Sequence, residues 1–219
     1  MPVMQNKNTM QEINYYQGYN DYLVVGSLGG GCDGMERVRA FLAIDITEEV
    51  RQKIAEFERE IDLVGADIKL VEVENLHVTM KFLGEVDSGI LEKVYDVMKM
   101  VKGESFAMNV EGVGVFPNWR MFRVVWVGIG EGGDRIAKIQ RELDAGLAKL
   151  GFERERDFVP HITVGRVRTP RNRDRLLQLL EKYKNHQFGR CKVEKLVLKK
   201  STLTPKGPIY SNLREVDLA

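Results

Sequence analysis

The feature that most limits how this chain can fold is a four-residue pattern that occurs twice. His77 begins the sequence His-Val-Thr-Met, and His161 begins the sequence His-Ile-Thr-Val. Phe41, in an apolar stretch, precedes the first pattern by 36 residues (77 − 41), and Val125 precedes the second by 36 (161 − 125). Alternating strand and helix units resemble one another in any case, but the equal offsets and the shared pattern favour an internal duplication. A duplication predicts two lobes related by a pseudo-twofold axis, with a cleft between them.

The hydrophobic periodicity predicts alternating strands and helices from residue 39 onward. Strands are expected at residues 39–44, 68–73, 76–83, 106–116, 122–129, 158–167, 193–203 and 209–216. Helices are expected at residues 47–61, 88–101, 134–150 and 174–183, and the first three carry an apolar stripe on one face.

The first 34 residues differ in composition from the rest of the chain. They are rich in Asn, Gln, Tyr and Gly, and Lys7 is their only basic residue. We expect residues 1–34 to be a flexible N-terminal extension or leader and residues 35–219 to form a single two-lobed domain. The net charge of +1 argues against a protein that coats nucleic acid by charge alone, although it allows a site for a single phosphate.

The sequence favours a cytoplasmic protein. Cys32 and Cys191 are too far apart to suggest a disulfide framework or a zinc motif, which is typical of a reducing compartment. No apolar run approaches the roughly 20 residues of a membrane-spanning helix, and no signal peptide is recognisable. We therefore expect no membrane association, and by default a monomer.

The repeated pattern places an imidazole beside a hydroxyl on each of two strands. Because side chains alternate along a strand, His77, Thr79 and Lys81 are expected on one face, as are His161 and Thr163 in the second copy. The opposite face, which helices are expected to cover, receives Val78, Met80 and Phe82.

This combination of side chains suits phosphoryl chemistry. A histidine, with an unperturbed pKa of about 6.5, can act as acid or base near neutral pH. A threonine can donate a hydrogen bond to a non-bridging phosphate oxygen. A single strand histidine is usually structural, but two copies within a repeat are harder to explain that way.

Metal and nucleotide cofactors fit the sequence less well. A catalytic zinc site usually has three protein ligands, and no third ligand is suggestively spaced. The remaining histidine, His186, lies in a polar stretch and is expected at the surface. The glycines at 29–31 lack the lysine of a P-loop. We expect acid–base catalysis with no metal and no cofactor.

The paired motif resembles the two-histidine phosphoesterase superfamily. The flanking sequence is similar to the branch of RNA 2′,3′-cyclic phosphodiesterases historically called 2′-5′ RNA ligases. The similar segments, which cover essentially the whole chain except the leader, are residues 39–44, 77–84, 114–117, 160–167 and 201–210.

The resemblance implies a fold and an activity. The fold would be α+β, with two pseudo-symmetric lobes whose antiparallel sheets carry helices on their outer faces and form a V-shaped central cleft. The reaction would be hydrolysis of an RNA-terminal 2′,3′-cyclic phosphate to a 2′-phosphomonoester. The partners would then be RNA ends or nucleoside 2′,3′-cyclic phosphates.

The resemblance also implies residue roles. His77 would donate a proton to the leaving 3′ oxygen, and His161 would accept a proton from the attacking water. Thr79 and Thr163 would bind the phosphate. Arg166 matches an arginine that the family places shortly after the second motif.

Four further residues are weaker candidates for substrate contacts. Strand alternation places Arg166 on the face away from the second histidine unless a bulge occurs at Gly165. Lys81 could meet a phosphate, and Phe116 could stack on a base or equally belong to the core. Lys206, in a Pro/Gly turn, could reach the mouth of the cleft or remain solvated. Residues 168–206 contain 12 Lys/Arg and 3 Asp/Glu, which could guide an RNA backbone or form solvated faces.

Three other functions stay open at this point. The same two histidines could join RNA ends through a 2′-5′ linkage, because only the nucleophile differs. They could also open another cyclic phosphate, for example one on ADP-ribose. A non-catalytic module that binds RNA ends is a third alternative, although a pure binder would not need both imidazoles in one cleft.

Overall fold

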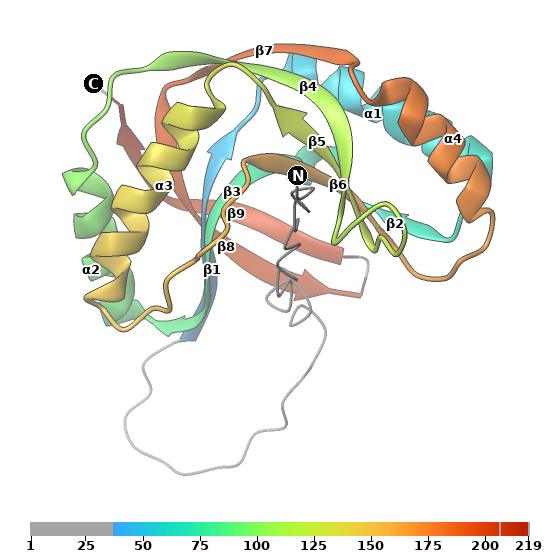
Figure 1. The fold of residues 1–219 in the computed structure, drawn as a ribbon. Helices are drawn as coiled ribbons and strands as arrows, with labels where there is room; N and C mark the ends of the chain where they lie inside the picture. The colour runs from blue at the N-terminus through green and yellow to red at the C-terminus, as the bar shows by residue number, and fades with distance from the viewer. Residues whose placement is uncertain (1–36, 206, 219) are drawn as a thin grey trace, which may run out of the picture. The chain divides into compact units, whose positions relative to one another are not determined.

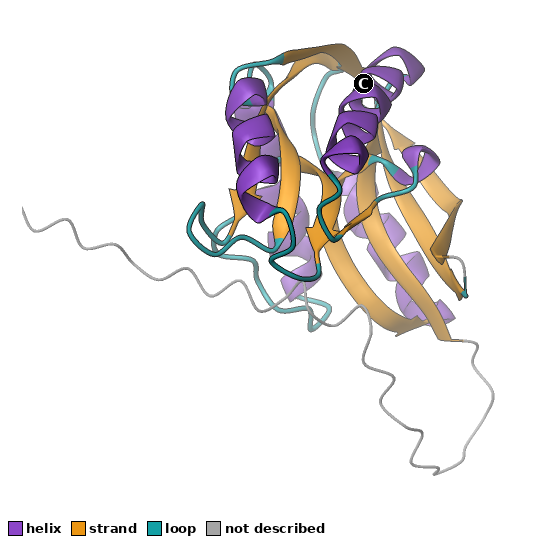
Figure 2. Ribbon diagram, turned by 90° about the vertical axis from the view of Figure 1, so that its right-hand side faces the viewer, coloured by secondary structure: helices purple, strands orange, loops and turns teal. Residues whose placement is uncertain are grey.

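The computed structural model describes residues 37–205 and 207–218, and they belong to one compact unit. The domain boundary expected at residue 35 lies outside this range and stays a prediction. The strands are β1 (Arg37–Asp45), β2 (Ile68–Leu70), β3 (His77–Asp87), β4 (Phe106–Phe116), β5 (Val124–Ile129), β6 (His161–Val167), β7 (Gln187–Val193), β8 (Lys195–Thr204) and β9 (Gly207–Asp217). The helices are α1 (Glu48–Val64), α2 (Ser88–Met100), α3 (Gly133–Ala148) and α4 (Arg173–Tyr183), with a 3₁₀ turn, η2, at Val73–Asn75 (Figures 1 and 2).

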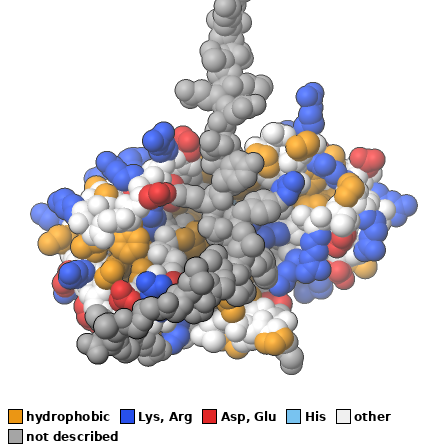
Figure 3. All heavy atoms as spheres, turned by 90° about the horizontal axis from the view of Figure 1, so that it is seen from below, with side chains coloured by type: hydrophobic (Ala, Val, Ile, Leu, Met, Phe, Trp, Pro, Cys, Tyr) orange, Lys and Arg blue, Asp and Glu red, His pale blue; other side chains and the backbone are white. Residues whose placement is uncertain are grey.

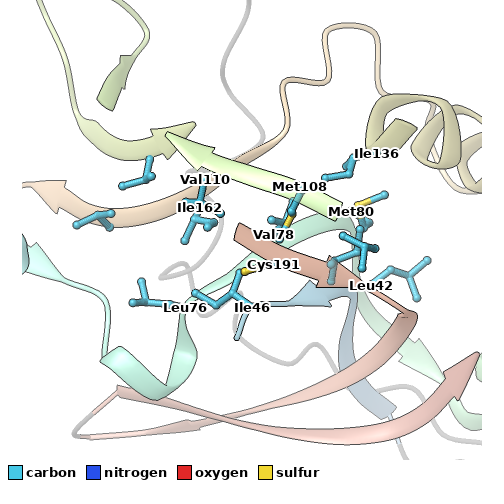
Figure 4. Close-up of a cluster of buried hydrophobic side chains, with 14 of the residues drawn as sticks. Leu42, Ile46, Leu76, Val78, Met80, Met108, Val110, Ile136, Ile162 and Cys191 are labelled. Atoms are coloured by element: carbon cyan, nitrogen blue, oxygen red, sulfur yellow. The ribbon is translucent and has the colours of Figure 1, made fainter. Parts of the chain in front are cut away.

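The strands form an antiparallel sheet that consists of two halves. Its order is β7-β4-β5-β6-β3-β1-β8-β9, and β2 pairs with β6 beside this path. The halves meet where β3 pairs with β6, through the single residue pair Val78 and Ile162. Both residues are fully buried in the apolar cluster drawn in Figure 4. The expected α+β fold with two related lobes is confirmed, and the two motif strands are neighbours at its centre.

Two helices cross from one half of the sheet to the other. α1 follows β1 and precedes β2 and β3 along the chain, yet it contacts β7 and α4 of the other half. α3 links β5 to β6, yet it contacts β3 and α2. Figure 1 accordingly shows α1 beside α4 and α3 beside α2. This exchange makes the two halves depend on each other for their cores.

Helix α1 illustrates why these elements form where they do. It begins with acidic residues in its first turn, which favour a helix N-terminus, and ends at Gly65, whose φ of 69° suits a residue without Cβ. Its stripe is completely buried and consists of Val50, Ile54, Phe57 and Ile61. No helix in the described range is long and apolar enough to cross a bilayer.

Strand β7 is the element that the sequence analysis missed. Phe188, Cys191 and Val193 of β7 are buried, but their spacing does not alternate regularly. The pairing of β7 with β4 shifts register beside Gly189, so two-residue periodicity is lost there. The expected strand at 68–73 is also shorter, because the chain leaves β2 and turns through η2 before β3.

In the structure, the residue equivalent to Phe41 in the second copy of the repeat is one position away from the residue that equal spacing in the sequence indicated. Phe41 pairs with Phe82, the fifth residue after the first motif histidine (82 − 77). Val124, not Val125, pairs with Arg166, the fifth residue after the second (166 − 161). The structurally equivalent residues are therefore Phe41 and Val124, and the equal offset of 36 residues was one position out.

The exchange of helices predicts that the contact between α1 and the opposite lobe is a main source of stability. The ring of Phe57 lies 4.5 Å from that of Tyr183 and 5.7 Å from that of Phe188. Phe57→Ala should lower the free energy of unfolding by about 3–5 kcal/mol, because it leaves a cavity between the lobes. Leu63→Ala, on the same helix but 86% exposed, is the matched control and should cost less than about 0.5 kcal/mol. Urea denaturation measures both, and equal costs would contradict this account.

Candidate active site

A bulge in β3 rearranges the face that carries the first motif. Between Thr79 and Lys81 the pairing with β1 shifts by one position, so Met80 is an extra residue. The bulge turns Lys81 away from the cleft, where it is only 6% exposed, and brings Phe82 to the face of Thr79 with 55% exposure. The expectation that Lys81 faces the cleft and Phe82 the core is therefore wrong, because simple alternation assumes an unbroken pleat.

The second motif strand carries the same bulge. The pairing of β6 with β5 shifts between Thr163 and Gly165, so Gly165 takes the core side and lies against Ile68. A Cβ at Gly165 would come within 2.8 Å of that isoleucine. Arg166 thereby returns to the face of His161, and its positive charge acts on the pKa of that histidine. The bulge that was expected to be necessary for Arg166 to share the face of His161 is therefore present.

The two motifs lie side by side with opposite directions. The residue after each motif histidine pairs with its counterpart across β3 and β6. Extending this antiparallel register by one residue each way puts His77 opposite Thr163, and Thr79 opposite His161. The register therefore relates each motif histidine to the threonine of the other copy across the two strands.

Both imidazoles are anchored in the same way. Nδ1 of His77 lies 2.6 Å from the backbone oxygen of Asn75, and Nδ1 of His161 lies 2.7 Å from that of Val159. Because a carbonyl oxygen can only accept, each Nδ1 carries the hydrogen and donates it. The neutral ring therefore keeps a lone pair on Nε2. In His77 this atom lies 2.9 Å from the hydroxyl oxygen of Thr79.

His77 lies among aromatic rings and a pair of opposite charges. Its ring centre is 4.9 Å from that of Phe41 and 5.5 Å from that of Tyr210. Lys199, whose side chain is mostly buried, places Nζ 2.9 Å from a carboxylate oxygen of Asp45. Asp45 in turn is the β1 residue that pairs with His77. None of these four neighbours was predicted as a site residue from the sequence, although Phe41 and Tyr210 belong to segments that resemble the family.

His161 lies in a second aromatic setting beside a cavity. Its ring centre is 4.9 Å from that of Phe116 and 5.9 Å from that of Trp126. Trp126, Val159 and Pro160 line a cavity of about 390 Å³. The indole Nε1 of Trp126 is buried and has no hydrogen-bond partner within residues 37–205 and 207–218. Phe116 thus lies against His161, and the cavity lies beside Val159 and Pro160, the two residues that precede this histidine.

Burial lowers the pKa of both histidines. Desolvation brings the pKa of His77 down to about 4, against the opposing effect of its hydrogen bond to Asn75. Desolvation also lowers the pKa of His161, again opposed by its backbone hydrogen bond, while Arg166 lowers it further. Both rings are therefore mainly neutral at pH 7 in the ligand-free protein, which suits a base and requires an acid to gain a proton first.

Two of the expected site residues lie elsewhere or are not described. Lys81 donates to Asp144 at 2.7 Å in the protein interior and cannot contact a phosphate in the cleft. Lys206 lies outside the described residues. Among the residues that the structure describes, no group of three His, Cys, Asp or Glu side chains is arranged to hold a metal ion.

The basic run at 168–206 does not form one continuous face. Most of its described basic residues are distributed over α4, β7 and β8, and several pair with carboxylates. The pairs are Lys184 with Glu181, Arg190 with Glu131, Lys192 with Glu194, and Lys195 with Glu215. On the face drawn in Figure 3, blue basic groups are likewise interspersed with red acidic ones. Glu181 and Glu194 belong to the run itself, so among these partners only Glu131 and Glu215 lower its excess of positive charge.

Comparison with known proteins identifies the family. The model of the LigT like Phosphoesterase family matches residues 44–126 and again residues 127–210, one motif histidine in each copy. The chain belongs to this family. The double match is independent support for the internal duplication.

Several relatives of this LigT-like phosphoesterase carry a functional name. The RNA 2′,3′-cyclic phosphodiesterase of Methanothermobacter thermautotrophicus is 44% identical over 179 residues, which span 81% of this chain and 97% of the relative. The protein of the same name from Methanocaldococcus jannaschii is 42% identical over 178 residues, 81% of this chain and 99% of the relative.

Solved structures agree with the fold. A protein from Thermus thermophilus superposes with a TM-score of 0.68 at 29% identity, covering 82% of this chain and 97% of its own. Escherichia coli LigT complexed with 3′-AMP has a TM-score of 0.68 at 24% identity, covering 84% and 99%, and shows likeness of fold.

The lowered histidine pKa values predict a loss of stability in mild acid. In the unfolded chain His77 binds a proton near pH 6.5, whereas in the folded protein it does so only near pH 4. Its contribution is therefore fully present above pH 6.5 and is lost as the pH falls toward 4. The loss should reach roughly 3 kcal/mol at about 1.4 kcal/mol per pH unit. Urea denaturation at a series of pH values measures it, and His77→Asn should make the dependence shallower; an identical slope would contradict this.

Proposed function

We propose that this LigT-like phosphoesterase hydrolyses the 2′,3′-cyclic phosphate at an RNA 3′ end and releases a 2′-phosphomonoester. The observation that carries the proposal is the pair of imidazoles, each fixed through Nδ1 on one of two adjacent antiparallel strands. The names of relatives that span four fifths of this chain support the same reaction.

The reaction needs one proton removed and one delivered. His161 would accept a proton at Nε2 from the attacking water, whose oxygen forms the new bond to phosphorus. The bond from phosphorus to the 3′ oxygen would break, and His77 would donate a proton from Nε2 to that oxygen. The 2′ oxygen keeps the phosphate. Thr79, Thr163 and Arg166, which share the face of the imidazoles, would hold the non-bridging oxygens as charge develops on them.

The low pKa of His77 adds a condition to this mechanism. A group with a pKa of about 4 carries almost no proton at pH 7, so the ligand-free protein lacks its acid. The cyclic phosphate is an anion, and a negative charge beside an imidazole raises its pKa. Binding of substrate would therefore bring the proton onto His77, and the hydroxyl of Thr79 would turn its own hydrogen toward the phosphate.

The substrate has two aromatic settings available for its base. Phe82, exposed on the cleft face, lies 6.1 Å from Phe41, which itself contacts His77. Trp126 lines the cavity next to the segment before His161, and the ring of Phe116 packs against that of Trp126. Because the leaving 3′ oxygen belongs to the terminal ribose, the terminal nucleoside would bind on the side of His77. The cavity beside His161 would then receive the water.

The remaining alternatives use the same site. Ligation through a 2′-5′ linkage would need a ribose hydroxyl in place of the water beside His161. Hydrolysis of another cyclic phosphate would need a different nucleoside beside His77. A non-catalytic RNA-end-binding module would not require both rings to keep a lone pair on Nε2. We also propose that the enzyme acts in the cytoplasm as a monomer.

The proposed function predicts turnover of a nucleoside 2′,3′-cyclic phosphate in EDTA. His77→Ala and His161→Ala should each lower kcat by about 10²–10⁴-fold, because each removes one proton transfer. His186→Ala is the matched control, since its ring packs on Tyr183 and Phe188 away from the cleft, and it should keep wild-type activity. Chromatography against 2′- and 3′-phosphate standards identifies the product.

Each other outcome of this assay has a distinct meaning. Activity that appears only when a divalent metal replaces EDTA would overturn the metal-independent mechanism. Wild-type protein that binds but never turns over a cyclic phosphate would favour the RNA-end-binding module. A 3′-phosphate product would reverse the choice of leaving oxygen.

The low pKa of His77 predicts that ligand binding takes up protons at pH 7. Titration calorimetry with a nucleoside 2′-phosphate, repeated in buffers of different ionisation enthalpy, should give binding enthalpies that depend on the buffer. The phosphate of this ligand can itself change protonation, so His77→Asn serves as the control. The variant should lose a large part of the proton uptake. Equal uptake in both proteins would show that His77 is not the group that gains the proton.

A further inference from the structure

The sheet alone holds the two motif histidines together weakly. One residue pair joins β3 to β6, whereas β1 and β3 pair along the whole of β1. The segment before His161, residues 151–160, is an irregular connection between α3 and β6. Because Val159 in this segment accepts the hydrogen of Nδ1, the position of the segment decides the position of the ring. Something other than strand pairing must therefore hold residues 151–160 in place.

A buried ion pair makes that connection. Lys81 of β3, turned inward by the bulge, donates to Asp144 of α3 at 2.7 Å and to the backbone oxygen of Glu153 at 2.5 Å. Asp144 accepts from the backbone N–H of Glu155, with both carboxylate oxygens at 3.2 Å. The exposed Arg154 donates from Nε to the second carboxylate oxygen of Asp144 at 3.4 Å. Lys81 and Asp144 are 6% and 2% exposed, so water competes little with these bonds.

The hydrogen bonds of Lys81 and Asp144 link the strand that carries His77 to the segment that precedes His161. Lys81 lies four residues after His77 (81 − 77), and Glu155 lies six residues before His161 (161 − 155). We propose that the Lys81–Asp144 ion pair positions His161 relative to His77, by fastening the segment that presents the second imidazole to the strand that carries the first. Both are positioning residues, since neither faces the cleft. The proposal rests on the proposed function for its effect on turnover.

The segment that precedes His77 is held by a separate set of hydrogen bonds. Arg51 of α1 donates through Nη1 to the backbone oxygens of Val73 at 2.7 Å and Leu76 at 3.2 Å. These oxygens flank Asn75, whose carbonyl holds the ring of His77. Loss of the Lys81–Asp144 pair should therefore disturb His161 and leave His77 in its place. This asymmetry separates a positioning role from a general loss of stability.

The ion pair can be removed without leaving a buried charge. Removing one partner of a buried pair is strongly destabilising, whereas replacing both by apolar residues of similar volume is often neutral. Lys81→Met combined with Asp144→Leu should therefore fold, with the wild-type circular dichroism spectrum. It should lower kcat by about ten- to a hundredfold and change KM far less, because misplacement of a catalytic group by about 1 Å is enough for such a loss.

The imidazoles report directly on the proposed role. NMR titration of the double variant should show the pKa of His161 raised toward its ordinary value, because the loosened segment exposes the ring, with that of His77 unchanged. His77→Asn and His161→Asn assign the resonances. This titration needs no turnover, so it tests the role of the ion pair even if the wild-type protein does not hydrolyse a cyclic phosphate. Absence of hydrolysis by the wild-type protein would contradict the proposed function and not the role of the ion pair.

A variant destabilised elsewhere completes the comparison. Leu180→Ala removes a fully buried side chain from α4, which packs on α1 and β4. It should lower the melting temperature but leave kcat and the titration of His161 unchanged. The proposal is overturned by a folded double variant with wild-type kcat and His161 titration. Equal shifts of both histidines, or the same loss of kcat in Leu180→Ala, would also overturn it.

Discussion

The antiparallel contact between β3 and β6 is the constraint on which the rest of this molecule depends. Val78 and Ile162 pair there, and their apolar side chains are buried in the common core. Each is preceded by a motif histidine, so burial of one face fixes the imidazoles on the other. The site is therefore a consequence of the core: the period of two that buries these residues also presents His77 and His161 to the cleft.

The duplicated bulge gives the two halves their different chemistry. In both strands one extra residue after the threonine exchanges the faces of the next two positions. The first copy thereby buries Lys81 and exposes Phe82, whereas the second buries Gly165 and brings Arg166 to the cleft. One half of the cleft thus offers an aromatic ring where the other offers a cation. This asymmetry distinguishes two histidines that the duplication would otherwise make equivalent.

Burial also determines how the histidines respond to a ligand. Partial burial reduces the hydration of both rings, and the one carbonyl hydrogen bond of each Nδ1 only partly offsets this loss. Neutral imidazoles are the result, with the proton on Nδ1 and a lone pair on Nε2. An anionic phosphate raises the pKa of such an imidazole more than that of a solvated histidine, because the charges interact in a medium of lower dielectric constant. Under the proposed function, binding of an anionic phosphate would thereby be coupled to the gain of a proton by His77.

The sequence by itself determined the helices, most of the strands and the pair of motif histidines. The helices and strands follow from the periodic spacing of apolar residues, and the histidines from a four-residue pattern that occurs twice; both are local properties of the sequence. It could not determine β7, whose alternation is broken by a register shift opposite β4, or the faces of Lys81, Phe82 and Arg166, which depend on bulges formed with neighbouring strands. Nor could it show that Lys81 meets Asp144 or that Phe41 and Tyr210 surround His77. Those contacts join residues far apart in the chain, and only the packing of one half of the sheet against the other decided them.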